Sequence, residues 1–281
     1  MKTRILPAHL ITNAVSDLIY KTSFSLPYAV GKRIEEMADN EDTELAKTAL
    51  RVLVENNSLA AEEGIPLCQD CGIVIVFLEI GQQVVIDGSI AEAVNGGVEE
   101  AYRKYHLRKS VVADPLKRNN TGTNAPAIIH VEPAAGDRVS VTVYLKGGGS
   151  ENMSSLKMFR PTDRDSDIID YIEKTVVKAG SNPCPPLFLG VGIGGTADTA
   201  MLNAKKAVLR GPGTRHPDPE YADLEARIEE RLNGTGVGPL GFGGRSTVGG
   251  VFIREAPTHI AMLPVALNLN CHSLRYGRVE L

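Results

Sequence analysis

The sequence lacks tryptophan, has few aromatic residues (5%) and only four cysteines in 281 residues, and shows no excess of positive charge. Its 30 Lys and Arg residues are outnumbered by 34 Asp and Glu residues, which gives a formal net charge of −4. A protein that follows the phosphate backbone of nucleic acid is therefore not expected. A hydrophobic fraction of 43% with 23% charged residues is typical of a globular protein, and it excludes a disordered chain or a coiled coil.

Long hydrophobic runs are also missing. The N-terminal segment begins with basic residues, but polar residues and Pro7 interrupt its apolar positions, so it does not match a secretory signal peptide. The longest apolar stretches, 72–80 and 260–269, are as long as strands and much shorter than the ~20 residues of a membrane-spanning helix. We therefore expect a soluble cytoplasmic protein without a membrane partner.

Hydrophobic periodicity predicts a mixed α/β (α+β) fold. The first sixty residues have helical spacing, with Thr43 as a candidate N-cap, and further helices are expected over 89–107, 167–179, 196–209 and 218–232. Strands are expected over 73–78, 82–85, 138–146, 187–191, 247–254 and 260–269. Because there is no internal repeat or Ser/Pro-rich linker, we expect a single large domain over 1–281, a mixed sheet packed with helices.

The four cysteines occur in three loops at the ends of predicted elements: 66–72, 182–186 and 268–272. In a reducing compartment they are not expected to form disulfides, which leaves buried packing, redox chemistry or metal binding. Prolines stiffen the middle loop, as suits a thiolate presented to a metal. The alternative is that Cys184 and Cys271 are small buried hydrophobic residues.

The spacing of the cysteines leaves the type of metal open. Structural zinc is usually bound by two close pairs, whereas here only Cys68 and Cys71 are close in sequence. An iron–sulfur cluster accepts widely separated cysteines. Four ligands would saturate a 4Fe–4S cluster and suit electron transfer, whereas three would leave one iron open as a Lewis acid.

Two glycine-rich segments could bring the backbone close to a ligand. Gly190, Gly192 and Gly195 match the G-x-G-x-x-G pattern, but the segment after the next helix does not supply the strand and acidic residue of a dinucleotide site. We interpret these glycines as a close approach of backbone N–H groups to an anion or a cluster. The segment 147–150 allows the same interpretation, with a flexible turn as the alternative.

Several charged side chains are candidates for proton transfer or anion binding, although most single charges lie on a solvated surface. These candidates are Asp70, Arg108, Lys146, Arg245 and His259. Spacing alone gives the other histidines an equal claim. The G-x-S-x-G motif of serine hydrolases is missing from the sequence.

Taken together, five separated motifs resemble the alpha chain of the class I fumarate hydratase and L-tartrate dehydratase family. They cover nearly the whole chain, in order. The motifs are Pro66-Leu67-Cys68-Gln69-Asp70, Lys146-Gly147-Gly148-Gly149-Ser150-Glu151-Asn152, Pro183-Cys184-Pro185-Pro186, Gly192-Ile193-Gly194-Gly195-Thr196 and Ala256-Pro257-Thr258-His259-Ile260-Ala261.

The resemblance implies an oxygen-sensitive hydro-lyase with a 4Fe–4S cluster in which one iron is not ligated by cysteine. The positions that match the family's ligands are Cys68, Cys184 and Cys271. The open iron would polarise the C–OH bond of a 2-hydroxy dicarboxylate. The family's catalytic or substrate-contacting positions correspond to Gln69, Asp70, Arg108, Gly148 and His259, with Asp70 in proton transfer and Arg108 on a substrate carboxylate.

One position departs from the family pattern, since members usually have Thr where this chain has Cys71. We expect Cys71 not to be a ligand. The resemblance also implies that the smaller swivelling domain of single-chain members is supplied here by a separate beta subunit. Self-association, giving a heterotetramer, is expected as well.

The favoured reaction is the interconversion of fumarate and (S)-malate, with L-tartrate dehydration as the alternative. Sequence does not separate them, because pocket contacts distinguish a hydroxyl or methyl group at one carbon. Two alternatives belong to other classes of protein. One is an electron-transfer or scaffold protein that uses all four cysteines, and the other is a binding domain stabilised by zinc.

Overall fold

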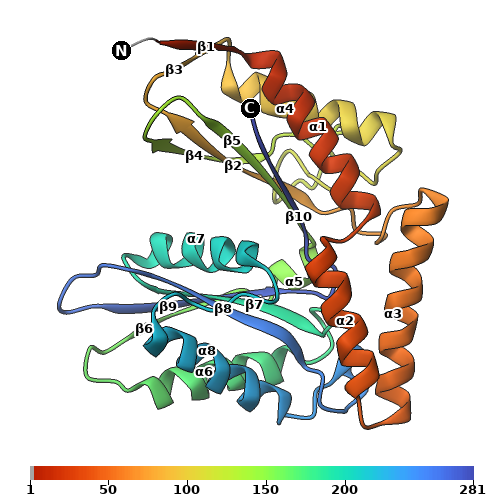
Figure 1. Cartoon of the computed structure of the whole chain (residues 1–281), viewed down its shortest axis with the longest axis vertical. Helices are drawn as coiled ribbons and strands as arrows, with labels where there is room; N and C mark the ends of the chain where they lie inside the picture. The colour runs from red at the N-terminus through yellow and green to blue at the C-terminus, as the bar shows by residue number, and fades with distance from the viewer. Residues whose placement is uncertain (1–2) are drawn as a thin grey trace. The chain divides into compact units, whose positions relative to one another are not determined.

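The computed structural model describes residues 3–281, which form two compact units interleaved along the sequence (Figure 1). Unit 1 comprises the N-terminal segment to Pro27, Asn57–Gly148 and Arg275–Leu281. Unit 2 comprises Tyr28–Asn56 and Gly149–Leu274. Each unit has its own four-stranded sheet and its own hydrophobic core, so each is described separately.

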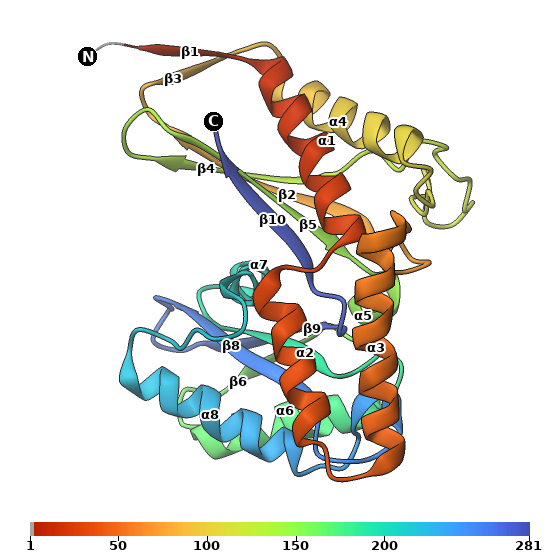
Figure 2. The same ribbon diagram turned by 45° about the vertical axis from the view of Figure 1, so that its right-hand side comes forward.

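Unit 1 is a mixed sheet covered by two helices. The sheet has the order β10-β5-β2-β4; β4 is parallel to β2, and β5 is antiparallel to both β2 and β10. Helices α1 and α4 lie side by side against the sheet in Figures 1 and 2. The elements are β1 (Arg4–Pro7), α1 (Ala8–Phe24), β2 (Ile73–Gly81), β3 (Val84–Asp87), α4 (Ile90–Lys104), β4 (Ile128–Ala134), β5 (Val139–Lys146) and β10 (Arg275–Glu280), with β1 and β3 forming a separate parallel pair.

Local sequence explains how the core of unit 1 forms. Ser89 caps α4, because its side-chain oxygen accepts a hydrogen bond from the backbone N–H of Glu92 at 3.3 Å. Gly97 lets α4 approach α1 closely, since a Cβ at this position would lie 2.5 Å from the carbonyl oxygen of Thr12. The alternating residues of β2 and β5 that face these helices are fully buried aliphatics, such as Val76 and Val143.

Unit 2 is a sheet covered on both faces. Its order is β6-β9-β7-β8; β7 is parallel to β8 and antiparallel to β9. Helix α7 packs on one face, and α6 and α8 pack on the other (Figure 1). The elements are α2 (Tyr28–Asn40), α3 (Glu44–Glu63, which continues into unit 1), α5 (Gly148–Glu151), β6 (Ser155–Phe159), α6 (Asp165–Ala179), β7 (Leu187–Gly194), α7 (Ala197–Ala207), η1 (Val208–Arg210), α8 (Pro219–Asn233), η2 (Pro239–Gly241), β8 (Val248–Ala256) and β9 (Leu263–Asn270).

The glycines of β7 serve helix packing, and our interpretation of them as an anion cradle was wrong for two of the three. A Cβ on Gly190 would lie 1.9 Å from the carbonyl oxygen of Ala204, and one on Gly192 would lie 2.0 Å from that of Ala200. Both acceptor residues belong to α7. These glycines therefore let α7 lie directly on the sheet, and the match to the dinucleotide pattern has a packing explanation.

The predicted mixed class is confirmed, and every predicted helix and strand has a counterpart in the structure. In place of one sheet, however, the described residues form two four-stranded sheets and a two-stranded pair. Because both units draw on separated parts of the sequence, the division does not fall at one point of the chain. That residues 1–281 form a single domain stays a prediction. In the described part of the chain, the helices are too short or too polar to cross a membrane.

Candidate functional site

The predicted site residues of unit 1 lie at the turn before β2 and at segments beside it. Asp70 is partly buried, and two backbone N–H groups hold its carboxylate: that of Gly72 donates to Oδ1 at 2.9 Å, and that of Gly148 donates to Oδ2 at 2.7 Å. The preceding residue, Gln69, is exposed. The structure thus brings Asp70 and Gly148 together, and it fixes both oxygens of the carboxylate at an open turn.

Gly147 packs closely against Asp70 in this arrangement. A Cβ on Gly147 would lie 3.3 Å from Asp70 Oδ2 and 4.0 Å from Nη2 of Arg275. Arg275 is fully buried at the start of β10, so a fixed positive charge lies near the carboxylate. The motif that the sequence flagged after Lys146 therefore packs closely against Asp70. Lys146 itself is fully buried, so it is not a solvated surface charge.

Arg108 follows α4 on the same unit and is exposed. In the described range 3–281, the ion pairs do not include its guanidinium. Its backbone N–H donates to Sγ of Cys71 at 3.2 Å. An exposed, unpaired guanidinium, on a residue whose backbone N–H bonds to the Asp70 turn, is suited to binding an anionic substrate group.

The two cysteines of unit 1 differ sharply. Cys68 is partly exposed, whereas Cys71 is 3% exposed and packs within the hydrophobic core. Burial raises the pKa of the Cys71 thiol, and this effect outweighs the backbone hydrogen bond from Arg108. The expectation that Cys71 is not a ligand stays a prediction.

The two cysteines of unit 2 lie at the same end of its sheet. Cys184 precedes β7 and Cys271 follows β9, and these strands are antiparallel with Phe188 opposite Asn270. The backbone N–H of His272 donates to the carbonyl oxygen of Cys184 at 3.1 Å, which joins the two loops. Cys184 is exposed and Cys271 is partly buried. Two of the three predicted cysteine loops therefore converge within this unit.

The loop around Cys184 is rigid. The backbone N–H of Cys184 donates to the carbonyl oxygen of Ser181 at 2.9 Å, and that of Leu240 donates to the carbonyl oxygen of Pro185 at 2.8 Å. Cys184 has φ = 53°, a left-handed conformation that non-glycine residues seldom adopt. Strain of this kind persists where surrounding contacts impose it, and it gathers at functional sites.

His259 lies at the opposite end of the same sheet. It stands between the end of β8 and the start of β9, next to the Ile193 end of β7, whereas Cys184 precedes the Phe188 end. The paired stretch between those ends is roughly 17 Å long at the usual strand rise. His259 is exposed, and its Nδ1 accepts the backbone N–H of Ala261 at 3.1 Å. Within this unit, His259 does not join the two cysteines.

Other residues that the sequence singled out have structural roles. Arg245 pairs with Asp42 at 3.2 Å, His216 pairs with Glu255 at 2.8 Å, and the ring of His130 stacks on Phe77. Sequence reasoning missed Tyr102 and Asn124, two fully buried polar residues that bond to the turn of Asp70. The signal for Asn124 was a polar residue before Ala-Pro in a loop, which is too common to stand out.

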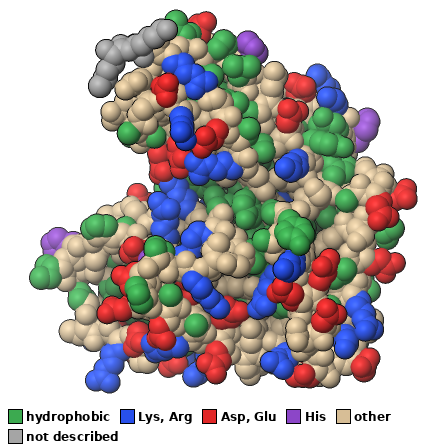
Figure 3. Space-filling view, in the orientation of Figure 1, with side chains coloured by type: hydrophobic (Ala, Val, Ile, Leu, Met, Phe, Trp, Pro, Cys, Tyr) green, Lys and Arg blue, Asp and Glu red, His purple; other side chains and the backbone are tan. Residues whose placement is uncertain are grey.

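Acidic and thiol groups do not gather into a ready metal centre inside either unit, since residues 3–281 contain no group of three or more His, Cys, Asp or Glu in such an arrangement. Lys/Arg and Asp/Glu side chains are interspersed on the face of each unit seen in Figure 3. This surface agrees with the absence of a basic tract from the sequence.

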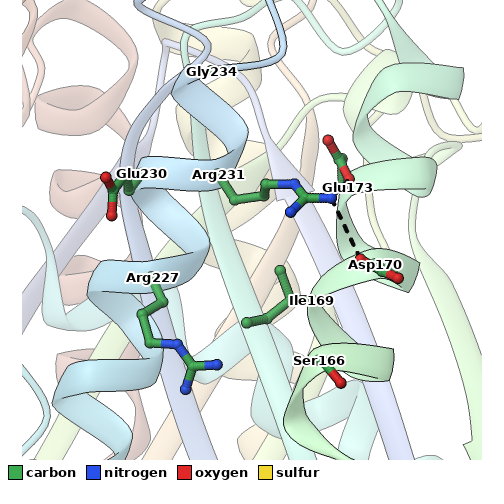
Figure 4. A pocket seen from close by; sticks show the side chains of 8 residues that line it. All are labelled: Ser166, Ile169, Asp170, Glu173, Arg227, Glu230, Arg231 and Gly234. Atoms are coloured by element: carbon green, nitrogen blue, oxygen red, sulfur yellow. Dashed lines mark hydrogen bonds and ion pairs between the residues drawn. The ribbon is translucent and has the colours of Figure 1, made fainter.

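A groove of about 610 Å³ lies between α6 and α8, away from the predicted site (Figure 4). Arg231 reaches across it to Glu173 and Asp170, at 2.8 Å and 3.5 Å. Arg227 is paired with Asp165 at 2.6 Å. Because Arg227 and Arg231 of α8 form ion pairs with acidic residues of α6, this groove has a structural explanation in holding the two helices together.

Comparisons with known proteins cover almost the whole chain. The family model described as "Fumarate hydratase (Fumerase)" matches residues 12–280. A protein of Methanocaldococcus jannaschii, named provisionally as L(+)-tartrate dehydratase subunit alpha, is 41% identical over 268 residues, which are 93% of this chain and 94% of that protein. The L(+)-tartrate dehydratase subunit alpha of Escherichia coli K12 is 31% identical over 270 residues, 95% of this chain and 89% of its own length.

Proposed function

Because this chain belongs to the fumarate hydratase (Fumerase) family, we propose that it is the alpha subunit of a hydro-lyase acting on a small 2-hydroxy dicarboxylate. The observation that carries the proposal is the Asp70 carboxylate, held by two backbone N–H groups at an open turn and neighboured by the Arg108 segment. This pairs a fixed proton acceptor with an unpaired cation on one unit. Adding or removing water next to a carboxylate needs both.

A 4Fe–4S cluster is the cofactor that the proposal requires, and three of the thiols suit it. Cys68, Cys184 and Cys271 form no disulfide bond and are at least partly exposed, and the last two lie on adjacent loops. We propose that these three hold the cluster and leave one iron without a cysteine ligand. When bound, such a cluster supplies a Lewis acid for the departing hydroxyl group.

The roles of the chain's own residues follow from their chemistry. Asp70 accepts the proton from the carbon next to the leaving hydroxyl in dehydration and returns it in hydration. Its two backbone hydrogen bonds fix the direction in which its free lone pairs point. Arg108 binds a substrate carboxylate through its guanidinium, and Gln69, exposed beside Asp70, offers an amide to the same substrate.

Two substrates fit this chemistry. The relatives' names favour L(+)-tartrate, and the family's description favours fumarate and (S)-malate. We place L(+)-tartrate first, in place of the fumarate–malate pair that the sequence analysis favoured, because both relatives are individual proteins at 41% and 31% identity, whereas the description covers a whole family. L(+)-tartrate and malate differ by one hydroxyl group on one carbon, so a few polar contacts in the pocket decide which of them is bound.

A separate beta subunit completes the site in this proposal, since both relatives are named alpha subunits. We also propose that two copies of the alpha chain associate. His259 lies at the sheet end opposite to Cys184 and Cys271, so a contact between His259 and a substrate at the cluster must come from a second copy. Complementation tests this idea. Mixed assemblies of His259→Ala and Cys184→Ser chains should regain activity that each variant lacks alone, and failure to regain it would contradict an exchange of His259.

The experiment for the function itself is anaerobic reconstitution of the chain with its beta subunit, iron and sulfide. Dehydration of L(+)-tartrate, D-tartrate and malate is then compared with hydration of fumarate. The proposal expects iron-dependent turnover of L(+)-tartrate or of the fumarate–malate pair. A protein that retains only zinc, or an iron protein that turns over none of these acids, would overturn it.

A further inference from the structure

A buried asparagine joins the turn of Asp70 to the segment of Arg108. Asn124 is 0% exposed and uses both ends of its amide. Its Oδ1 accepts the backbone N–H groups of Ser110 at 2.7 Å and Val111 at 3.2 Å, and its Nδ2 donates to the carbonyl oxygen of Gly72 at 3.2 Å. One side chain thus bonds to the chain two residues after Asp70 and two residues after Arg108.

Two further side chains support this region: Tyr102 joins the turn to α4, and Cys71 joins it to Arg108. The hydroxyl of Tyr102, also fully buried, lies 2.8 Å from the carbonyl oxygen of Cys71 and 3.1 Å from that of Gly72. The Sγ of Cys71 accepts the backbone N–H of Arg108 at 3.2 Å. The side chains of Asn124 and Cys71 therefore join the Asp70 turn to the Arg108 segment by hydrogen bonds. All of these residues belong to unit 1.

This network is costly to maintain for stability alone. Asn124 has φ = 65°, in the left-handed region where asparagine is better tolerated than most residues. Burying a polar amide is unfavourable unless its hydrogen bonds are satisfied, and a satisfied buried network imposes one geometry on its surroundings. Here the geometry that it imposes is the separation between the Asp70 turn and the Arg108 segment.

We propose that Asn124, Tyr102 and Cys71 are positioning residues that set the spacing between Asp70 and Arg108, and through it the length of dicarboxylate that the site accepts. This inference rests on the proposed function. An arginine fixed relative to the proton acceptor binds the far carboxylate only when the acid has the matching number of carbons. Loosening the connection should weaken binding of the four-carbon acid and reduce discrimination against a five-carbon 2-hydroxy dicarboxylate.

The test replaces Asn124 in the full chain assembled with its beta subunit. Asn124→Gly removes the side chain and tolerates the left-handed backbone, whereas Asn124→Asp keeps an oxygen that accepts from Ser110 and Val111. Asn233→Gly is the matched control, because Asn233 Oδ1 likewise accepts two consecutive backbone N–H groups, those of Thr247 and Val248, at 3.0 and 2.9 Å in unit 2.

Three quantities are measured: amide hydrogen exchange, KM and kcat for the preferred four-carbon acid, and KM for 2-hydroxyglutarate. In Asn124→Gly we expect faster exchange at Ser110 and Val111, a rise of about tenfold in the four-carbon KM and a smaller change in kcat. The KM for 2-hydroxyglutarate should change less, so selectivity falls. Asn124→Asp keeps the acceptor but loses the Nδ2 donor to Gly72, so exchange at Ser110 and Val111 should stay near wild type while the four-carbon KM still rises. Asn233→Gly should change exchange at Thr247 and Val248 only.

Two outcomes would overturn the proposal in distinguishable ways. If Asn124→Gly speeds exchange at Ser110 and Val111 but leaves KM and selectivity as they are in Asn233→Gly, the network has only a structural role. A wild-type enzyme that turns over no 2-hydroxy dicarboxylate would remove the proposed function, and this inference with it. If Asn124→Gly does not fold, Cys71→Val and Cys71→Ser repeat the contrast at the Arg108 amide, since only serine keeps an acceptor.

Discussion

Unit 1 holds its predicted functional residues with buried side chains, whereas in unit 2 the loop of Cys184 is held through the main chain. The Asp70 turn and the Arg108 segment depend on Asn124, Tyr102 and Cys71. Around Cys184, by contrast, the bonds run from backbone to backbone and prolines limit the conformations of the loop.

The contrast matches two chemical requirements. A cluster needs thiolates at fixed points, and a proline-stiffened backbone supplies one at Cys184, while the buried Asn270 donates to the carbonyl oxygen of Cys271 at 2.9 Å. A substrate site must fit one acid among close relatives, and side-chain networks can be tuned one residue at a time. Single substitutions of non-ligand residues should therefore affect function more in unit 1 than in unit 2. The predictions below test this difference, starting with the largest effect.

Replacing a proposed ligand in unit 2 should have the largest effect. In Cys184→Ser we expect iron content and hydro-lyase activity to fall more than about a hundredfold, because a ligand loss should exceed the cost of losing an outer-shell contact. The measurement is iron and acid-labile sulfide per chain after anaerobic reconstitution, followed by activity. Full iron content in this variant would show that Cys184 is not a ligand.

Asp70→Asn should give the next largest effect. The amide keeps an acceptor for one backbone N–H but cannot take a proton, so kcat should fall about 10²- to 10⁴-fold with a small change in KM. Steady-state kinetics of the reconstituted enzyme provide the measurement. Asp198→Asn is the control, since Asp198 is exposed in unit 2 and its carboxylate accepts a hydrogen bond from the hydroxyl of Thr196. Equal losses in both variants would argue against a role of Asp70 in proton transfer.

Glu41→Gln should lower stability without acting on the substrate. Glu41 is buried in unit 2 and accepts backbone N–H groups from Asp42, Arg245 and Ser246 at 2.9, 3.1 and 3.0 Å. Burial by itself raises the pKa of Glu41, but these hydrogen bonds outweigh it and leave the pKa below the ordinary 4.5. We expect the variant to lose about 1–3 kcal/mol of unfolding free energy at pH 7.

The pH dependence of this loss has a definite sign. Because the native pKa of Glu41 is lowered, its contribution is fully present above about pH 4.5 and is lost as the pH falls through the native value. Denaturant unfolding between pH 7 and pH 3 should therefore show wild type and Glu41→Gln converging in acid. A gap that widens toward low pH would contradict the assignment.

Cys71→Thr should have the smallest effect. Threonine keeps an acceptor for the Arg108 N–H and nearly the same volume, so we expect unchanged iron content, activity within about twofold and a loss of about 1 kcal/mol from burying the hydroxyl. Iron analysis and denaturant unfolding check this. Loss of the cluster would make Cys71 a ligand and favour the electron-transfer alternative.

Sequence patterns predicted the long elements well but not the short edge strands. The continuous apolar run at 73–78 and the alternation at 139–146 correspond to β2 and β5. Strands β4 and β10 were missed, because Pro133 and Gly277 interrupt the pattern and these edge positions bury little. Pairing with a neighbouring strand, which periodicity does not report, defines them.

For the site, the sequence motifs identified the candidate residues, and the structure added the backbone and side-chain groups that hold them in place. Asp70 and Gly148 lie far apart in sequence, and their hydrogen bond depends on how β2 and β5 pair. Asn124 and Tyr102 could not be singled out in the sequence, because a buried polar residue is recognised only from the groups around it. The distance between His259 and the two cysteines likewise follows from strand direction, which the motifs do not encode.

The central claim is that this chain carries an iron open to a dicarboxylate substrate, and ⁵⁷Fe Mössbauer spectroscopy tests it most directly. The anaerobically reconstituted assembly is measured with and without saturating L(+)-tartrate or malate. The account predicts one iron whose spectrum differs from the other three and shifts when the acid binds. Four cysteine-ligated irons that do not respond to either acid would contradict it.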